Sequence, residues 1–313
     1  MSNIDLTRGS GGKQASPSRP NFFQNLRQSQ TQQRKFSIIL RWIIAVFLII
    51  FAMFPVIWIV SASFNPSETL ATQKLIPRNV GLDNYHKLLN NELFPYWTWY
   101  WNSLKISTIT TVLSVSITTV AAYAFSRFRF SGRTTMLKGI LLVQVFPGLL
   151  SMVAIFLMIS QFGDFMPVVG LNTHAGLILV YLGGAMGINI WLMKGFFDTI
   201  PREIDESAMV DGASHWQIFT LLLLPLMRPV LIVVGILSFI GTYGDFILAR
   251  ILLKKTELYT VMVGLQVVTQ GEFSQQWGQF AAGALLGALP IMLVYLLLQD
   301  QIVGGLTKGS VKG

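Results

Sequence analysis

The chain has 313 residues, of which 52% are hydrophobic and only 12% are charged, and it contains no cysteine. Soluble domains average about 25% charged residues, so this composition excludes a soluble globular protein and indicates a helical integral membrane protein. The lack of cysteine excludes disulfides, thiolate catalysis and cysteine-ligated metal sites.

Residues 1–35 form a polar segment rich in Ser, Gln, Asn and Arg, with basic residues throughout and Asp5 as its single acid. Such a composition cannot bury a core, so we expect a disordered tail. Its positive charge favours the cytoplasmic side of a membrane. An RNA-binding tail is the alternative, but aromatic residues that would stack on bases are limited to Phe22 and Phe23.

Hydropathy predicts that residues 36–313 form one all-α transmembrane domain with six spans. The second span is rich in Thr, Ser and Ala and is therefore expected to pack inside the bundle. Two glycine pairs, Gly183 with Gly187 and Gly283 with Gly287, have the small-xxx-small spacing of packed helices. The expected spans are 40–62, 102–126, 137–160, 176–197, 222–246 and 279–303.

The distribution of lysine and arginine sets the expected orientation. With the N-terminus inside, the cytoplasmic tails and loops together hold most of the basic residues, including Arg127, Arg129 and Arg202, whereas the outer loops hold fewer, and both termini are cytoplasmic. The formal net charge of +9 is then explained by orientation in a cytoplasmic (inner) membrane, rather than by binding of nucleic acid.

Residues 201–220 interrupt the apolar sequence with a polar segment that we expect in the cytoplasm. Pro201 suits a helix start, and Asp211-Gly212 is a stop signal because glycine readily adopts the left-handed conformation. Ser214 is a candidate cap for a second helix that runs through Trp216 and Phe219. The carboxylates that would complement the dipole of the first helix are Glu203, Asp205 and Glu206. The segment predicts a helix–turn–helix elbow at the membrane surface, and an ordinary solvated loop is the alternative.

Two longer loops, 63–101 and 250–278, are expected on the outer side. Aromatic residues 94–101 end the first loop, and they suit an interfacial belt or, alternatively, a platform for carbohydrate. The second loop contains Gln266 and Trp277, which would contact a sugar or a partner protein, unless the loop is a plain connection. Asp245, near the outer end of the fifth span, would pair with Arg250 or line a transport pathway.

Motifs for catalysis are missing from the sequence. It has no G-x-x-x-x-G-K-[ST], H-E-x-x-H or G-x-S-x-G motif, and the histidines His86, His174 and His215 are too scattered for a metal site. We therefore expect no bound cofactor or metal and no ATP hydrolysis by this chain. Gln144 and Asn189, which lie within spans, are expected to form hydrogen bonds between helices.

The sequence Glu206-Ser-Ala-Met-Val-Asp-Gly-Ala213, followed by Phe219 and Leu224-Pro225, resembles the "EAA" signature of the permease subunits of bacterial ABC importers. Glu206, Ala208, Asp211 and Gly212 match that signature, and Ser207 replaces its first alanine. The resemblance implies that the elbow is a coupling helix that docks in a groove on a separate ATPase. Glu206 would then offer a charge to a basic group of the ATPase, and Gly212 would let the elbow bend.

Residues 121–132 resemble the end of the second span in sugar-importer permeases. Residues 239–244 and 304–313 resemble the smaller permease of maltose and maltodextrin transporters (MalG type), and the likeness covers about 36–313. It implies a second, larger permease subunit, an ATPase dimer that binds ATP and Mg in the cytoplasm, and a periplasmic sugar-binding protein. The transported sugar would be held mainly by the larger permease. A stand-alone secondary transporter or channel, and a structural membrane anchor, are the competing interpretations.

Overall fold

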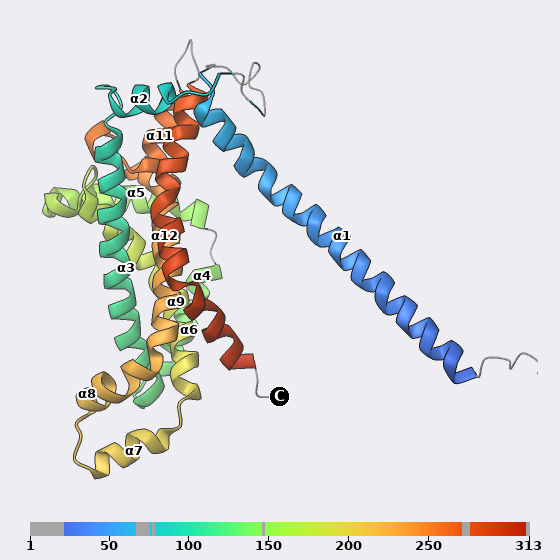
Figure 1. Ribbon diagram of the computed structural model, residues 1–313. Helices are drawn as coiled ribbons and strands as arrows, with labels where there is room; N and C mark the ends of the chain where they lie inside the picture. Colours follow the sequence, from blue (N-terminus) through green and yellow to red (C-terminus); the bar gives the residue numbers. More distant parts are fainter. Residues whose placement is uncertain (1–21, 67–75, 77–78, 146–147, 271–275, 311–313) are drawn as a thin grey trace, which may run out of the picture. The chain divides into compact units, whose positions relative to one another are not determined.

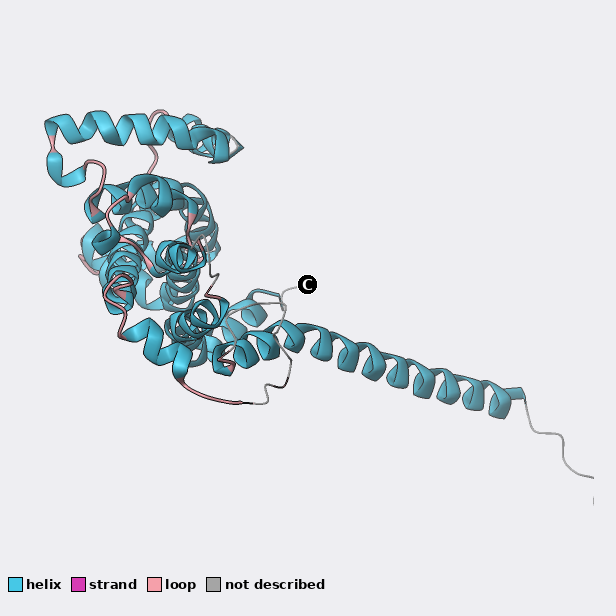
Figure 2. Ribbon diagram, turned by 90° about the horizontal axis from the view of Figure 1, so that it is seen from above, coloured by secondary structure: helices cyan, strands magenta, loops and turns pink. Residues whose placement is uncertain are grey.

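The computed structural model describes residues 22–66, 76, 79–145, 148–270 and 276–310, and these residues form helices and loops without a strand (Figures 1 and 2). The α-helices are α1 (Phe22–Phe64), α2 (Asp83–Leu89), α3 (Tyr96–Arg127), α4 (Arg133–Val145), α5 (Gly148–Phe165), α6 (His174–Thr199), α7 (Arg202–Val210), α8 (His215–Gln217), α9 (Leu224–Tyr243), α10 (Ile247–Leu252), α11 (Val261–Thr269) and α12 (Trp277–Ser310). Short 3-10 helices cover Pro167–Val169 and Thr256–Leu258, and a π-helix covers Ile218–Leu223. The predicted all-α class is confirmed.

The chain divides into two compact units, residues 1–57 and residues 58–313. In the first unit, α1 begins at Phe22, within the segment expected to be disordered, and residues 1–21 lie outside the described residues. Residues 22–35 contain neither glycine nor proline and are rich in Gln, with two Arg and one Lys, all residues of high helix propensity. A polar composition predicts the lack of a buried core, but it does not prevent an extension of the apolar helix that follows.

Among the described residues, four helical segments are long and apolar enough to cross a membrane, namely 34–64, 96–127, 215–243 and 277–299. Two bent pairs bring the number to six if each pair is one span: 133–145 with 150–165, at 109°, and 174–184 with 186–199, at 46°. The predicted third and fourth spans are therefore not straight helices. Gly183 and Gly184 lie at the bend of α6, where two residues of low helix propensity weaken the backbone.

Helix α3 is the central helix of the second unit and packs mainly against α6 and α9. Between Ser103 and Thr118 its buried face follows helical spacing and consists mostly of small hydroxyl side chains, as predicted from the composition of the second span. These residues are Ser103, Ser107, Thr110, Ser114 and Thr118. The polar contacts expected within the spans are also present, since Gln144 Nε2 donates to Gly184 O at 3.4 Å and Asn189 Nδ2 lies 3.5 Å from Ser114 Oγ.

The aromatic residues at the start of α3 divide between core and surface. Tyr96 and Trp99 are 1% and 0% exposed, whereas Trp97 and Trp101 are 49% and 64% exposed. A Cβ atom on Gly264 of α11 would lie 2.0 Å from the Trp99 ring, so only glycine allows this contact. An interfacial belt therefore fits only the exposed members of this run, because its other rings fill the core.

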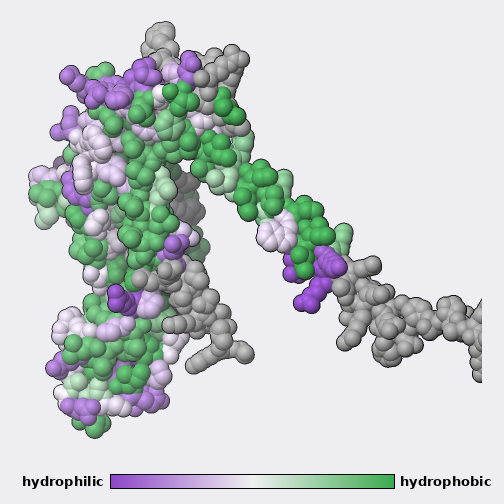
Figure 3. Space-filling model, viewed as in Figure 1, coloured by the Kyte–Doolittle hydropathy of each residue, from purple (hydrophilic) through white to green (hydrophobic). Residues whose placement is uncertain are grey.

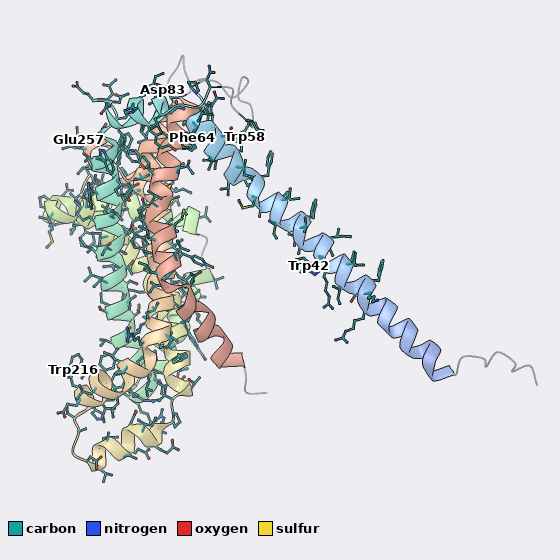
Figure 4. All side chains as sticks on the ribbon, viewed as in Figure 1. Trp42, Trp58, Phe64, Asp83, Trp216 and Glu257 are labelled. Carbon is teal, nitrogen blue, oxygen red and sulfur yellow. The ribbon has the colours of Figure 1, made fainter. Side chains whose placement is uncertain are left out.

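Small residues pack α12 in the same way. A Cβ on Gly283 would lie 2.4 Å from Leu265 Cδ2, which confirms the packing expected of this glycine. A Cβ on Gly183 would meet no atom of the described residues within 4 Å. In the second unit, hydrophilic residues gather around α2 and around α7, and hydrophobic residues cover much of the surface of α3 and α12 between them (Figure 3). The two polar ends are called the α2 end and the α7 end below; Asp83 and Glu257 lie at the α2 end, and Trp216 lies near the α7 end (Figure 4).

Candidate functional site: the elbow at the α7 end

Helix α7 has the start and the stop that its sequence predicts. Pro201 is its N-cap residue, and Glu203 and Asp205 lie in its first turn. After Val210 the backbone turns at Gly212, whose φ of +84° is in the left-handed region that favours glycine. The N–H groups of Gly212 and Ala213 donate to carbonyl oxygens within the last turn of α7, at 3.1 and 2.9 Å, and so satisfy the helix end.

The second part of the elbow begins with the predicted cap and then departs from a regular α-helix. Ser214 and Gln217 form a reciprocal capping box, in which Gln217 N–H donates to Ser214 Oγ at 3.3 Å and Ser214 N–H donates to Gln217 Oε1 at 2.8 Å. After Gln217 the chain forms the π-helix, where the sequence predicted a regular helix. Pro225 has no N–H and its ring crowds the carbonyl of Leu221, and the wider π turn accommodates both effects.

The predicted docking residues lie together on α7 and the turn that follows it. Glu206, Ser207 and Asp211 are exposed, and Ala208 is half-buried against the core. The hydrophobic side chains of Met209 and Val210 are 43% and 88% exposed, so the tip of the elbow presents apolar surface beside carboxylates. A hollow of about 320 Å³ adjoins this surface and is lined by Ala208, Asp211, Gly212, Ala213, Gln217, Leu221 and Leu222.

A buried ion pair joins α7 to the end of α3. Arg127 Nε lies 2.6 Å from Asp205 Oδ2, and the two side chains are 7% and 10% exposed. The Arg127 Nη1 and Nη2 atoms donate to the carbonyl oxygens of Phe197 and Ile200, both at 3.1 Å. These carbonyls belong to the last turn of α6 and its C-cap, where helix geometry leaves acceptors unpaired and favours positive charge. One guanidinium at the end of α3 therefore contacts both α6 and α7.

A second layer of polar contacts surrounds this ion pair. Arg202 Nη2 donates to Ser126 O at 3.0 Å, and Ser126 Oγ donates to Asp198 Oδ1 at 2.6 Å. Asp198 also forms an ion pair with Lys194, one turn earlier on α6. The network connects α3, α6 and the first turn of α7 through side chains from all three helices.

Aromatic rings hold the other half of the elbow against the same end of α3. Tyr123 donates its hydroxyl hydrogen to His215 O at 3.2 Å, and its ring lies 4.8 Å from the ring of Phe219. Phe128 contacts the His215 ring edge-on, with the ring centroids 5.2 Å apart. Residues 123–128 therefore contact both helices of the elbow. We call this segment the socket.

The predicted pathway residues lie elsewhere in the structure and form two groups. Gln266 and Trp277 line one cavity of about 450 Å³ between α11 and α12. Asp245 lies outside that lining and accepts hydrogen bonds from Tyr181 Oη at 2.8 Å and Ala249 N at 3.2 Å. Arg250 is directed to the Tyr259 ring, 5.7 Å from its centroid, so the structure does not support the first of the two roles expected for Asp245, pairing with Arg250. Much of the expected second loop is helical, since α11 occupies residues 261–269.

Reasoning from the sequence missed the socket. Arg127 was counted only toward membrane orientation, and Asp205 only toward the dipole of α7. A usable signal was present, because Tyr123 and Arg127 lie one helical turn apart at the end of a span whose buried face is polar.

Within the described residues, no group of three His, Asp or Glu is arranged to hold a metal ion.

Comparison with known proteins identifies relatives of the chain. Residues 114–307 match the family described as "Binding-protein-dependent transport system inner membrane component". The chain is 44% identical over 272 residues to the maltose/maltodextrin transport system permease protein MalG of Vibrio vulnificus strain YJ016, covering 83% of this chain and 91% of the relative. It is 39% identical over 295 residues to the MalG protein of Escherichia coli strain K12, covering 91% of this chain and 99% of the relative.

Solved structures have the same fold. A chain in the crystal structure of a bacterial ABC transporter involved in the import of the acidic polysaccharide alginate aligns with a TM-score of 0.74 at 24% identity, covering 87% of this chain and 98% of that chain. A chain in a bacterial alginate ABC transporter, in complex with an alginate pentasaccharide-bound periplasmic protein, aligns with a TM-score of 0.64 at 16% identity. The alignment covers 87% of this chain and 94% of that chain.

Proposed function

The chain belongs to the family of binding-protein-dependent transport system inner membrane components, and we propose on this basis that it is a permease subunit of an ATP-driven importer of maltose or maltodextrins. The observation that carries the substrate class is 39–44% identity, over most of the chain, to permeases named for maltose and maltodextrin transport. Fold similarity to alginate transporters supports the importer architecture without bearing on the sugar.

In this proposal the partners are a second permease subunit, an ATPase dimer and a periplasmic sugar-binding protein. The α7 end faces the cytoplasm, as lysine and arginine distribution favours, and the N- and C-termini lie on that side. ATP and Mg bind only to the ATPase subunits. The crystal structure of an alginate transporter in complex with a periplasmic protein is a precedent for the periplasmic sugar-binding protein as a partner.

The elbow carries the proposed coupling. Exposed Glu206, Met209 and Val210 give α7 a carboxylate beside apolar surface, which suits a groove with a basic group and a hydrophobic floor. Closure of the ATPase dimer would move α7, and the helices attached to it would change the side on which the pathway is open. Gln266, Trp277 and Asp245 remain candidates for contact with the sugar or with the binding protein.

The test is purification of the tagged chain from native membranes in mild detergent, followed by reconstitution into liposomes. We expect a second permease and a P-loop ATPase to copurify, and maltose-loaded binding protein to stimulate ATP hydrolysis and sugar uptake. Uptake by the chain alone, without ATP, would instead support a secondary transporter or channel.

Two substitutions in α7 and its turn sharpen the test. Gly212→Pro is expected to uncouple hydrolysis from uptake, because proline cannot adopt the positive φ of this turn, while membrane insertion persists. Glu206→Lys is expected to reduce retention of the ATPase on the purified permease, because it reverses the exposed charge. Normal uptake in the first variant together with normal ATPase retention in the second would refute the role of the elbow.

A further inference from the structure

We propose that Arg127 and Asp205 are positioning residues that transmit motion of the elbow to the transmembrane helices. The inference rests on the proposed coupling function and assigns it a mechanical path: from α7, through the Asp205 carboxylate, to the Arg127 guanidinium and so to α3 and α6 together. Glu206 lies on the exposed side of α7 and takes no part in this path, so it is available to contact the ATPase.

The first step is the position of Asp205. It follows Ile200 by five residues, and Arg127 contacts both, through the Ile200 carbonyl and the Asp205 carboxylate. The chain between α6 and α7 is therefore held at both ends by one side chain from a third helix. A planar guanidinium with fixed donor directions resists rotation of the groups that it joins, more than a single hydrogen bond does.

The second step is the isolation of the ion pair. The two side chains are 7% and 10% exposed, so water screens their attraction only weakly. Asp205 Oδ1 is buried and has no hydrogen-bond partner among the residues that the structure describes. The carboxylate therefore depends on Arg127 for compensation of its charge, and displacement of α7 alone would separate two buried opposite charges.

The third step is the difference between the two ends of α7. At its C-terminal end the joint is Gly212, where the backbone has a glycine conformation and a Cβ atom would meet no atom of the described residues within 4 Å. At its N-terminal end the joint is the ion pair and the Arg202 contact with Ser126. A force applied to α7 is consequently delivered at the stiff N-terminal joint, while the open turn at Gly212 allows the helix to tilt.

The experiment measures sugar uptake and ATP hydrolysis on the same liposome preparations of the assembled transporter. Asp205→Asn keeps the size of the side chain but removes its charge, and Asp205→Glu restores the carboxylate. Glu203→Gln is the matched control, because it neutralises an exposed carboxylate in the same turn of α7. We expect at least a tenfold fall in sugar transported per ATP for Asp205→Asn, hydrolysis within twofold of the wild type, and wild-type ratios for Glu203→Gln. Asp205→Glu should recover most of the ratio.

Arg127→Lys provides a second variant if Asp205→Asn fails to assemble. Lysine keeps the charge but is a point donor that cannot serve both carbonyls and the carboxylate in the guanidinium geometry, so the same loss of transport per ATP is expected. A merely structural role would lower uptake and hydrolysis in proportion, and that result would overturn the proposal, as would an unchanged ratio in Asp205→Asn. Lack of ATP-dependent uptake by the wild-type transporter would instead refute the proposed function.

Discussion

The two ends of α3 hold other segments of the chain by different chemistry. At the α2 end, neutral donors bind backbone carbonyls: Trp99 Nε1 donates to Thr256 O at 2.8 Å, and Asn102 Nδ2 donates to Glu257 O at 2.8 Å and Tyr259 O at 3.1 Å. At the α7 end, the guanidinium of Arg127 serves a carboxylate and two carbonyls.

This difference indicates different duties. Neutral side-chain bonds to backbone, packed around a buried tryptophan, fix one conformation of residues 256–261 at low electrostatic cost. A buried ion pair contributes less net stability than its Coulomb energy suggests, but its separation is costly, so it maintains the register between helices. The neutral contacts at the α2 end suit a region that keeps one conformation. The ion pair at the α7 end suits a contact that stays intact while it transmits movement between helices.

The largest expected effect on stability comes from removing the ion pair at the α7 end. Arg127→Met should lower the free energy of unfolding by about 3–5 kcal/mol, because it leaves the Asp205 carboxylate buried without a counter-charge. Chemical denaturation of the detergent-purified protein measures this loss. Arg129→Met removes an exposed arginine two residues away and is the control, expected to change little. Equal losses in the two variants would contradict the account.

The neutral end should yield a smaller effect. Asn102→Ala removes one amide and leaves the buried Tyr259 carbonyl and the partly buried Glu257 carbonyl with fewer donors, so we expect a loss of about 1–3 kcal/mol in the same denaturation experiment. Lys105→Ala, at an exposed position of α3, is the control. A loss as large as that of Arg127→Met would remove the distinction between the ends.

The open joint of the elbow should respond to backbone chemistry. Gly212→Ala is expected to cost about 1–2 kcal/mol, because a Cβ atom disfavours the left-handed conformation, and Gly212→Asn should cost less. Gly195→Ala, at an exposed glycine of α6 without a positive φ, is the comparison and should be neutral or slightly stabilising. A reversed order of the two Gly212 variants would show that the turn does not depend on its φ.

The smallest effect concerns the cap of α8. Ser214→Ala should cost about 1 kcal/mol and speed amide hydrogen exchange around residues 215–218, whereas Ser214→Asp preserves an acceptor and should change exchange little. Unaltered exchange in Ser214→Ala would mean that the Tyr123 and Phe128 contacts hold this segment without the cap.

Local chemistry made part of the elbow predictable. The glycine turn at Gly212 and the cap at Ser214 depend on neighbouring residues, and the apolar spans depend on composition, so a single sequence contains the required information. The pairing of Arg127 with Asp205 joins residues that are far apart in the chain. It depends on how α3, α6 and α7 meet, which helical periodicity does not specify.

Other differences have the same origin. Polarity predicted a loop at residues 250–278, but tertiary packing of Trp99 against Gly264 supports a helix there. The aromatic run at 94–101 gave no indication of which rings face the core, because the register of α3 is set by its partners. The π-helix at 218–223 has a local cause instead, because Pro225 disturbs the preceding turn, and the sequence interpretation used Leu224-Pro225 only as part of the permease signature.

The absence of cysteine from the chain permits the most direct test of the elbow as the ATPase contact. Val210→Cys, at a position 88% exposed on the elbow, and Leu93→Cys, at a position 78% exposed at the α2 end, would each be treated with a short thiol-to-amine crosslinker in native membranes. We predict a product containing a P-loop ATPase, identified by mass spectrometry, from Val210→Cys alone. The same ATPase product from Leu93→Cys, or its absence from both variants, would contradict the assignment of α7 as the coupling helix.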